Sequence, residues 1–414
     1  MTPAEAPRTA TGTTAGSRPA PRRKVLISGA GITGPALAYW LTRYGHTVTV
    51  VEKAGAPRGG GYPVDVRGTA LEVVRRMGLL PRLRDARIDS RRFTFLDGDG
   101  GIVAAVDPYA LGGGAAGRDL EIRRGDLAEA LYAAVRDEVE FRFDDTIDTL
   151  DQSGHGVDIT FRRGGEHTFA LVVGADGTHS RTRELVFGPE ERFHRYLGYC
   201  FAGFTLPNTF GLSREIVMWN TPGRAAALYA VADDGDVHAL LNFARPRPPF
   251  DAFRDPADWL DPVAEVFAGA GWEVPRLIGA MGEAGDLFAD VVAQIRLPRW
   301  STGRVALVGD AAYAPSFLTG QGTSLALVGA YMLAGCLAVE TDPAEALAAY
   351  ERRTRPFVTA NQDLIGDGDA LLFPTTAGGL RRRNEMLRAL RTAPATAGRP
   401  AHSALTLPVF TPGR

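Results

Sequence analysis

The sequence Lys24-Val-Leu-Ile-Ser-Gly-Ala-Gly-Ile-Thr-Gly34 decides the fold of this chain. Its first five residues form an apolar run typical of a buried parallel strand. Three glycines follow in the spacing Gly-x-Gly-x-x-Gly, a helical pattern then runs to Gly45, and a β-branched strand, His46–Val51, ends at Glu52. This order of strand, glycine-rich turn, helix, strand and acid predicts a βαβ unit that binds a dinucleotide.

Each part of the motif has a physical role in holding a pyrophosphate and a ribose. Gly29 permits the tight turn, Gly31 lets the backbone approach the pyrophosphate, and Gly34 lets the helix pack closely on the strand. The helix N-terminus offers unpaired N–H groups and partial positive charge to the phosphates, and Glu52 can accept hydrogen bonds from a ribose diol. The alternative is an ordinary turn in a chain with 49 glycines, and the motif alone does not separate NAD from FAD.

A second motif, Leu171-Val-Val-Gly-Ala-Asp-Gly177, has the pattern of a buried strand that ends in Asp176 and Gly177. A helix-start pattern follows it, from Ser180 to Arg183. Taken alone, this motif is a β-turn with Asp at a favoured position. It becomes informative because it accompanies the first motif, and together with the third it favours FAD.

The third motif begins with the strand pattern Gly303-Arg-Val-Ala-Leu-Val and ends at Gly309 and Asp310. Asp310, at a strand end, can hold a ribityl hydroxyl group. A second glycine pair just before a long apolar helix places bare backbone N–H groups at a helix N-terminus, where they would face the pyrimidine side of a flavin. The residues concerned are Gly320, Gln321, Gly322 and Thr323. The alternative is a glycine-flanked loop before a core helix.

The composition is that of an ordinary two-domain globular protein. The 414 residues exceed the size at which one core stops growing, and 45% are hydrophobic and 23% charged. A net charge of −2 without a basic stripe argues against a nucleic-acid partner. Two distant cysteines, Cys200 and Cys336, fit a reducing compartment and have no metal-like spacing.

No segment has the pattern of a signal peptide or a membrane span. Residues 1–23 are rich in Ala, Pro and Thr and lack a continuous apolar core, which predicts a disordered leader. Ser324–Val339 is uncharged but shorter than the ~20 residues needed to cross a bilayer, so it is expected to be a core helix. We therefore expect a cytoplasmic enzyme that does not bind membranes.

Between Arg183 and Asp286 the chain has the pattern of an antiparallel sheet. Its segments alternate with turns such as Thr221-Pro-Gly223, which indicates a sheet inserted into the nucleotide-binding domain. We expect the substrate to lie between this sheet and the cofactor, against an aromatic lining that favours a flat, largely apolar ligand. The candidate lining residues are Phe201, Trp219, Tyr229, His238, Asn242 and Phe317, with His238 and Asn242 on one face. The alternative is a sheet half-covered by aromatic side chains, with His238 at its solvent edge.

The three motifs in this order resemble the single-component flavin aromatic hydroxylases, typified by para-hydroxybenzoate hydroxylase and the tetracycline-inactivating monooxygenases. The resemblance extends from Lys24 to Val339. It implies that Arg124, which begins the pattern Arg-Gly-Asp-Leu127, contacts FAD, although the adjacent Arg123 leaves the register open. It also implies that Asp176 and Gly177 bridge the FAD pyrophosphate region and the nicotinamide donor.

The sequence departs from the pattern of this family beside the expected flavin ring. The family has Gly-Asp-Ala-Ala-His and a proline pair before Gly-Gln-Gly, whereas this chain has Tyr313 at the His position. Only Pro315 is present of the prolines, with Ser316 and Phe317 following. Thr323 and Ser324 stand where the family has Asn after Gly-Gln-Gly. These differences bear on the oxygen reaction and not on FAD binding.

We therefore expect an α/β protein with a Rossmann-like FAD-binding domain of the glutathione reductase type, an inserted, mostly antiparallel substrate sheet and a C-terminal helix. The FAD-binding domain is assigned to 24–75, 111–182 and 286–342, and the substrate domain to 76–110 and 183–285. A C-terminal helical segment is expected over 343–395 and a tail over 396–414.

The resemblance implies a monooxygenase in which NADPH or NADH, as a transient reductant, reduces FAD. Oxygen then adds at flavin carbon 4a, and the hydroperoxide hydroxylates or epoxidises an aromatic or polyketide-like substrate in secondary metabolism or xenobiotic modification. No side chain is required as a catalyst, because the cofactor carries the chemistry. A flavin-dependent dehydrogenase or reductase, and a flavin-binding protein without turnover, are the alternatives. The protein is expected to be a monomer or homodimer.

Overall fold

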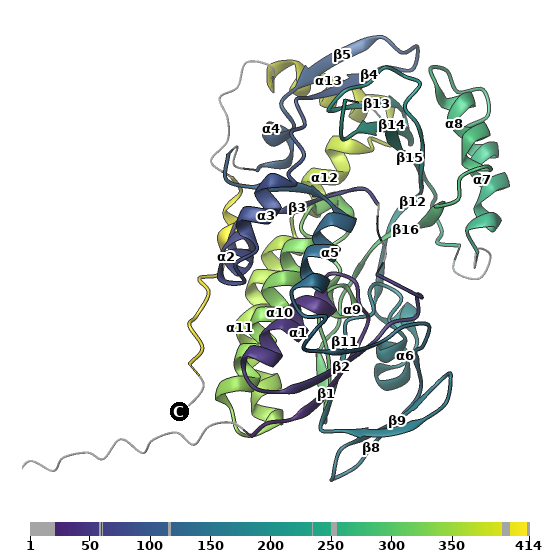
Figure 1. Ribbon diagram of the computed structural model, residues 1–414. Helices are drawn as coiled ribbons and strands as arrows, with labels where there is room; N and C mark the ends of the chain where they lie inside the picture. The colour runs from purple at the N-terminus through teal and green to yellow at the C-terminus, as the bar shows by residue number, and fades with distance from the viewer. Residues whose placement is uncertain are drawn as a thin grey trace, which may run out of the picture.

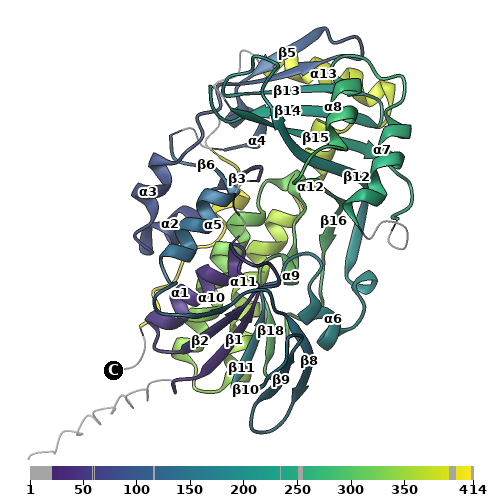
Figure 2. The ribbon, with the colours of Figure 1, turned by 45° about the vertical axis from the view of Figure 1, so that its right-hand side comes forward.

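The computed structural model describes residues 21–411 except 58, 60, 115–116, 234, 250–254 and 391–397. Two sheets lie at opposite ends of an elongated molecule, with long helices packed beside one of them (Figures 1 and 2). This arrangement confirms the expected α/β fold with an inserted antiparallel sheet.

The first sheet contains the strands of all three glycine motifs. Its core strands are nearly completely buried and apolar, which is why they pair in parallel with helices on the outside. β1 lies at the centre, parallel to both β2 and β11, and β18 continues the parallel order. The strand order is β17(Ser301–Thr302), β18(Val305–Leu307), β11(Leu171–Gly174), β1(Lys24–Ser28), β2(Thr47–Val51) and β7(Glu140–Arg142).

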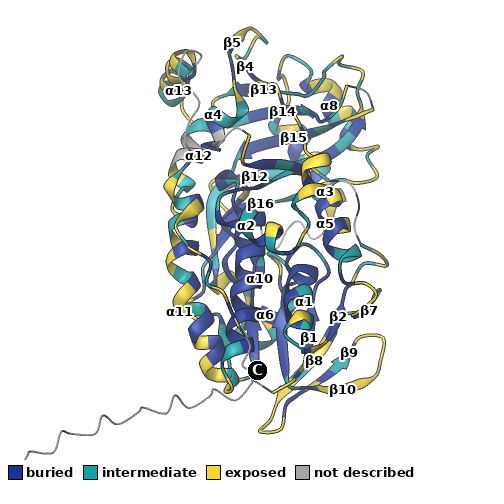
Figure 3. Ribbon diagram, turned by 60° about the vertical axis from the view of Figure 1, so that its left-hand side comes forward, coloured by how far each residue is buried: buried dark blue, intermediate teal, exposed yellow. Residues whose placement is uncertain are grey.

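Helix α10 (Gly322–Val339) is the central helix of this domain. It packs between α1 (Thr33–Arg43) and α11 (Pro343–Gln362), and it is buried along its length, whereas α11 has an exposed face (Figure 3). Among the described residues, α10 is the one helix long and apolar enough to cross a membrane, but 89% of it is buried inside the protein. The core position explains its composition.

The second sheet has seven strands, mostly antiparallel, and covers the other end of the molecule. Residues on one of its faces pack against α7 (Leu260–Val266) and α8 (Val274–Met281). Residues on the other face pack towards η3 (Phe317–Thr319) and the C-terminal helices. The order is β16(Phe288–Ile295), β12(His194–Pro207), β15(Asp236–Ala244), β14(Arg224–Ala230), β13(Glu215–Thr221), β4(Arg92–Leu96) and β5(Ile102–Val106).

Short elements connect and extend the two domains. β3 and β6 form a two-stranded ribbon beside α10, and β8, β9 and β10 form a small antiparallel sheet. Their bounds are β3(Pro63–Val66), β6(Leu120–Arg123), β8(Ile147–Gln152), β9(Val157–Phe161) and β10(Glu166–Phe169). The remaining helices are α2(Thr69–Arg76), α3(Leu80–Asp85), α4(Pro108–Gly112), α5(Arg124–Ala133), α6(Arg181–Phe187), α9(Asp310–Tyr313), η1(Glu190–Arg192), η2(Pro256–Trp259) and η4(Pro400–Ser403).

Several expected boundaries differ from the structure. β16 pairs with β12 in the large sheet, although its residues were expected in the FAD-binding segment 286–342. Met77 and Leu83, placed with the substrate domain, pack in the core of the nucleotide-binding domain. The periodicity of the sequence cannot show to which domain such a segment belongs, because an apolar strand or helix of the same composition can pack in the core of either domain.

The C-terminal segment is three helices instead of one. α11 is followed by α12 (Ile365–Leu372) and α13 (Ala377–Leu390), and the residues expected to end this segment, 391–395, lie outside the described residues. α13 turns back to pack on β5 of the large sheet. Helix α13 therefore contributes to the domain of the large sheet.

The expected tail, 396–414, packs against the protein where it is described. Side chains of α2 donate hydrogen bonds to the carbonyl oxygens of Leu405 (2.7 Å) and Pro408 (2.8 Å). The Phe410 ring covers Gly335 so closely that no Cβ would fit there. At the other end, most of the expected leader lies outside the described residues.

The end of that leader is fixed. Arg23 is buried and its guanidinium donates to the carbonyl oxygen of Leu337 at 3.0 Å. It also donates to the carbonyl oxygens of Glu340 and Thr341, beyond the last turn of α10. A cation at a helix C-terminus complements the partial negative charge there, so ordered chain begins before Lys24.

Candidate functional site

The glycines of the first motif are required by close backbone contacts. Gly29 has φ +107°, and a Cβ there would lie 2.5 Å from the carbonyl oxygen of Ala175. A Cβ at Gly34 would overlap the carbonyl oxygen of Gly29. A Cβ at Gly31 would meet only the Arg124 guanidinium, at 3.7 Å. Gly29 and Gly34 therefore hold the turn together, and Gly31 faces open space beside a cation.

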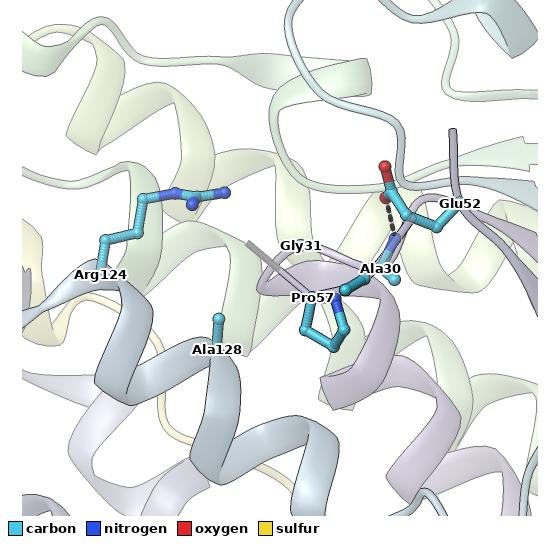
Figure 4. A pocket seen from close by; sticks show the side chains of 7 residues that line it. Ala30, Gly31, Glu52, Pro57, Arg124 and Ala128 are labelled. Carbon is cyan, nitrogen blue, oxygen red and sulfur yellow. Dashed lines mark hydrogen bonds between the residues drawn. The ribbon is translucent and has the colours of Figure 1, made fainter. Parts of the chain in front are cut away.

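A narrow pocket opens at this turn, lined by Ala30, Gly31, Glu52, Ala56, Pro57, Arg124 and Ala128. Figure 4 shows the Arg124 guanidinium reaching from α5 towards Gly31 and Glu52 on the other side. Glu52 is buried, and its two oxygens accept hydrogen bonds from the backbone N–H groups of Ala30 (2.7 Å) and Ala54 (2.9 Å). Glu52 thus fixes the turn as well as marking the expected ribose position.

Arg124 begins α5, and its guanidinium forms no hydrogen bond or ion pair with the residues that the structure describes. Arg123, the other candidate for this register, is exposed. The free cation beside the glycine turn favours Arg124 as the residue that would meet a pyrophosphate.

The second motif forms a tightly bonded turn. Asp176 accepts hydrogen bonds from the Ser180 hydroxyl (2.5 Å) and from the backbone N–H and hydroxyl of Thr182 (both 2.9 Å). Gly177 has φ +85°, and a Cβ there would meet nothing within 4 Å. The carboxylate of Asp176 is therefore occupied by hydrogen bonds at the start of helix α6, while Gly177 has open space beside it.

Arg183 joins the second motif to the third. Its side chain is completely buried and donates to the carbonyl oxygens of Thr178 (2.6 Å) and Ala311 (3.0 Å). It also forms an ion pair with Glu190 at 2.7 Å. Because Ala311 follows Asp310 in α9, this arginine fixes the distance between the two loops.

The third motif lies against the first. Gly309 has φ +67°, and a Cβ there would overlap the hydroxyl of Thr33, at the start of α1. Burial raises the pKa of the next residue, Asp310, and the positive charge of Arg124 partly offsets this. The carboxylate of Asp310 lies 3.8 Å from the position of a Cβ on Gly322. The first and third motifs thus converge on one place.

The loop before α10 has the unused polar groups expected of a cofactor site. Gly320 has φ +63°, and its Cβ position lies 3.1 Å from the Asp65 carboxylate. Gln321 is completely buried and its Oε1 has no hydrogen-bond partner among the described residues. Thr323 is in the first turn of α10, next to Ser324. The Ser324 hydroxyl accepts a hydrogen bond at 3.1 Å from the backbone N–H of Arg67, which directly follows β3.

These residues fit FAD. Glycine turns leave the backbone exposed to a pyrophosphate, Arg124 offers an unpaired charge, Asp310 offers a carboxylate, and the N-terminus of α10 offers N–H groups. The Oε1 of Gln321, which has no hydrogen-bond partner among the described residues, could accept a hydrogen bond from an N–H group of the flavin ring.

Two departures from the family pattern have structural explanations. The Tyr313 side chain is buried in the core, where its hydroxyl bonds to that of Tyr350 at 3.0 Å and its ring lies 4.5 Å from Trp300. Ser316 has φ +73°, which a proline ring cannot adopt. Tyr313 is therefore a packing residue, and the backbone at Ser316 excludes the missing proline.

Four of the expected lining residues share one face of the large sheet. Phe201 pairs with Asn242, and His238 pairs with Tyr229 and lies opposite Thr205. Directly paired residues point to the same face, so these side chains lie together on the face towards η3. Burial lowers the pKa of His238, whose Nδ1 shares a hydrogen bond with the Thr205 hydroxyl at 3.1 Å.

The expectation for Trp219 is wrong. Its side chain lies on the opposite face, in the core under α7 and α8, and its Nε1 donates to the carbonyl oxygen of Gly98 at 3.0 Å. Met218 and Asn220, its neighbours in β13, point to the face that Trp219 was expected to occupy. The pleat of the strand places alternate residues on opposite faces.

Phe317 brings the two domains into contact at the loop before α10. Its ring centroid lies 5.2 Å from that of Phe201 and 6.1 Å from that of Phe373, and 37% of the residue is exposed. The ring of Phe288 also contacts that of Phe201, edge to face, with the ring centroids 5.7 Å apart. An aromatic wall therefore joins the sheet to the glycine loop where a flavin ring is expected.

Sequence reasoning missed a chain of hydrogen-bonded polar side chains that ends at Tyr229. The Ser90 hydroxyl lies 2.7 Å from both the Tyr229 hydroxyl and a carboxylate oxygen of Glu121. Burial, together with the charge of Asp65, raises the pKa of Glu121 to about 7. No local pattern marks these residues, because they come from three distant segments.

Comparison with known proteins agrees with this geometry. The sequence model of the FAD binding domain family matches residues 22–200 and 289–364. A flavin-dependent monooxygenase of Legionella longbeachae is 34% identical over 340 residues, which cover 82% of this chain and 87% of the relative. The uncharacterized protein Rv1260 of Mycobacterium tuberculosis is 41% identical over 351 residues, covering 83% and 93%. The crystal structure of tetracycline destructase Tet(55) superposes with a TM-score of 0.81 at 34% identity, covering 94% of this chain and 99% of that one.

The expected cofactor, FAD, and the expected resemblance are thereby confirmed. The matched segments contain both glycine loops and the Asp-Gly turn. Sequence, fold and relatives lead to one assignment: the chain belongs to the FAD binding domain family, as a flavin-dependent monooxygenase related to the single-component aromatic hydroxylases.

Proposed function

We propose that this enzyme uses NADPH or NADH and O2 to insert one oxygen atom into an aromatic or polycyclic small molecule. The observation that carries the proposal is the contact of Phe201 on the sheet with Phe317 beside the glycine loop, at 5.2 Å. It sets an aromatic surface next to the place where a flavin ring would lie. The similarity to tetracycline destructase Tet(55) supports a flat, multi-ring substrate.

FAD, when bound, supplies the oxidation of NAD(P)H and the activation of O2. The protein contributes binding and orientation. Gly31 and Arg124 would hold the pyrophosphate, Asp310 a ribityl hydroxyl, and Gln321 with the N-terminus of α10 the pyrimidine edge of the ring. Gly177, which has open space beside it, would leave room for the nicotinamide donor.

The substrate side would exclude water and orient the ring to be oxidised. Phe201 and Phe317 offer flat apolar surfaces, while Tyr229, His238 and Asn242 offer polar groups on the same sheet face. A mostly apolar wall with a few placed polar groups is the usual composition of a small-molecule site.

Cofactor binding is tested first, by titrating the apoprotein with FAD. Arg124→Met is expected to weaken FAD binding by roughly 10- to 100-fold, the effect of losing charge-assisted hydrogen bonds to a phosphate. Arg123→Met is the matched control, because Arg123 is exposed and adjacent, and it should bind FAD as the parent protein does. Equal loss in both variants would reject the assignment of Arg124.

Turnover is tested by rapid mixing of the chemically reduced holoenzyme with O2 in the presence of phenols, indoles and tetracycline. A transient near-ultraviolet absorbance before the oxidised flavin spectrum returns, and a product heavier by one oxygen atom, would support the proposal. Direct reoxidation under every condition, with no oxygenated product, would point to a dehydrogenase or reductase. Tight ligand binding without NAD(P)H oxidation would point to a binding protein.

A further inference from the structure

Arg383 is a buried cation without a countercharge. It lies on α13, is 3% exposed, and its guanidinium stands 4.8 Å from the centre of the Phe95 ring. One nitrogen, Nη1, donates to Oδ1 of Asn220 at 3.1 Å. Nε and Nη2 have no partner among the described residues.

No carboxylate offsets this charge in the described part of the chain. Burial alone lowers the pKa of Arg383, to about 10, and no acidic side chain acts on it in the opposite direction. Buried arginines in proteins are normally paired, because an unpaired charge is poorly tolerated away from water. The buried Arg183, which forms an ion pair with Glu190, follows that rule. Arg383 does not, and its two unused N–H donors point to an anion as the missing partner.

The neighbours of Arg383 place it at the substrate face of the large sheet. Its partner Asn220 lies opposite Ala225, Ala225 lies opposite Asn242, and Asn242 lies opposite Phe201. These four residues form one row across adjacent strands and point to the same face. Because neighbouring strands are about 4.8 Å apart, Asn220 and Asn242 are separated by about 10 Å, and Ala225 is the residue between them in the row. The Nδ2 of Asn220 also donates to the carbonyl oxygen of Leu372 at 3.1 Å.

Asn242 is the second unsatisfied group in this row. It is 1% exposed, and neither its Oδ1 nor its Nδ2 has a hydrogen-bond partner among the described residues. A buried carboxamide without partners is rare, since each unmet group loses its hydration without compensation. The charged Arg383, bound to Asn220, and the unsatisfied Asn242 thus lie on either side of the small residue Ala225. Together they would form a polar end of an otherwise aromatic site.

We propose that Arg383, together with Asn242, binds an ionised oxygen of the substrate, so that the enzyme selects aromatic or polycyclic molecules that carry a carboxylate, phenolate or enolate. This inference rests on the proposed function, because it takes the sheet face as the substrate site. The planar guanidinium would receive the anionic oxygen on Nε and Nη2 while Nη1 stays on Asn220. An ionised phenol or enol is also more electron-rich than its neutral form, which suits an electrophilic oxygen donor.

The experiment measures binding to the oxidised holoenzyme without any reductant. The probes are 2-naphthoate and 2-naphthamide, which have nearly the same shape and differ in charge, and binding is followed by calorimetry. We expect naphthoate to bind more tightly, and Arg383→Met to lose roughly 10- to 100-fold of the naphthoate affinity while the naphthamide affinity changes little. Arg382→Met, an exposed neighbour on the same helix, is the control and should keep the preference.

A third probe, 2-naphthol, distinguishes the two kinds of anion. Its absorbance reports ionisation directly, and a pKa lowered on binding to the parent enzyme but not to Arg383→Met would indicate phenolate selection. Naphthoate selectivity without this shift would restrict the site to carboxylates. Should Arg383→Met fail to fold, Arg383→Lys keeps the charge but lacks the planar fork, and a weakened preference for naphthoate is expected.

The inference is overturned if the parent enzyme binds naphthoate no better than naphthamide, or if Arg383→Met weakens both probes equally. The second result, accompanied by lower thermal stability, would make Arg383 a packing residue. Because no step requires oxygen, an enzyme that shows the anion preference but never oxygenates a substrate would refute the proposed function and leave this site intact.

Discussion

Arg183 offers the sharpest test of how the cofactor site is held together. Its completely buried side chain connects the carbonyl oxygen of Thr178, in the Asp-Gly loop, with that of Ala311, in the helix that follows β18. It also pairs with Glu190 at 2.7 Å. Arg183→Met keeps most of the aliphatic volume and removes all three contacts at once.

The expected loss of stability can be worked out from these contacts. A hydrogen bond to a charged group contributes about 1.5–3 kcal/mol, and breaking a buried ion pair typically costs about 3–5 kcal/mol. Two effects reduce the loss here: Glu190 keeps a second partner in His179, and the buried Nε of Arg183 is unsatisfied in the parent protein. We therefore expect Arg183→Met to lower the free energy of unfolding by about 3 kcal/mol.

Urea unfolding of the apoprotein measures this value without the contribution of bound FAD. The control is Arg181→Met, on the same helix, whose pair with Glu184 has side chains 39% and 56% exposed. That exposed pair should contribute less than about 0.5 kcal/mol. If Arg183→Met loses no more than the control does, the idea that this arginine fixes the two loops is refuted.

Three further outcomes are expected. Gly34→Ala should abolish FAD binding in a titration, because its Cβ would overlap the carbonyl oxygen of Gly29, whereas Gly279→Ala, a helical glycine with open space around it, should bind FAD normally. Hydrogen bonds to two carboxylates raise the pKa of His179 from 6.5 to about 10. The protonated His179 therefore stabilises the fold fully below pH 6.5, and this stabilisation is lost as the pH rises through 10. Between these pH values the urea midpoint of His179→Gln should fall less than that of the parent protein. Burial raises the pKa of Glu121 from 4.5 to about 7, so the folded state binds the proton more tightly than the unfolded state. The free energy of unfolding should therefore fall as the pH rises from 4.5 to 7, and Glu121→Gln should remove that fall. If the dependence of the urea midpoint on pH is the same in Glu121→Gln as in the parent protein, Glu121 does not titrate in this range.

The cofactor half of the molecule was predictable from sequence because its requirements are local. Gly29 and Gly309 have positive φ values, and a Cβ at Gly29, Gly34 or Gly309 would overlap a neighbouring atom. Gly29 and Gly309 follow the ends of the buried strands β1 and β18, and parallel strands bring their carboxyl ends to one edge of the sheet. Three motifs far apart in sequence therefore had to meet.

The substrate half was less predictable because its large sheet is covered on both faces. In a sheet with one wet face, alternation of polar and apolar residues reveals which side chains point inwards. Here Trp219 and Met218 are both buried, on opposite faces, so composition could not show that Trp219 points away from the site. The polar groups opposite it come from segments that only the fold brings together.

The two halves of the site follow opposite physical rules. On the cofactor side, glycines have no side chains, so the backbone itself can contact the cofactor. This requirement is visible in the sequence as the spacing of the glycines. On the proposed substrate side, side chains remain but some lack partners: Asn242 and Arg383 have hydrogen-bonding groups that nothing in the described chain satisfies. A folded protein tolerates such groups when a ligand completes them. If so, replacing either residue by an apolar one of similar volume should leave stability unchanged or higher while selectivity is lost, the reverse of what Arg183→Met does.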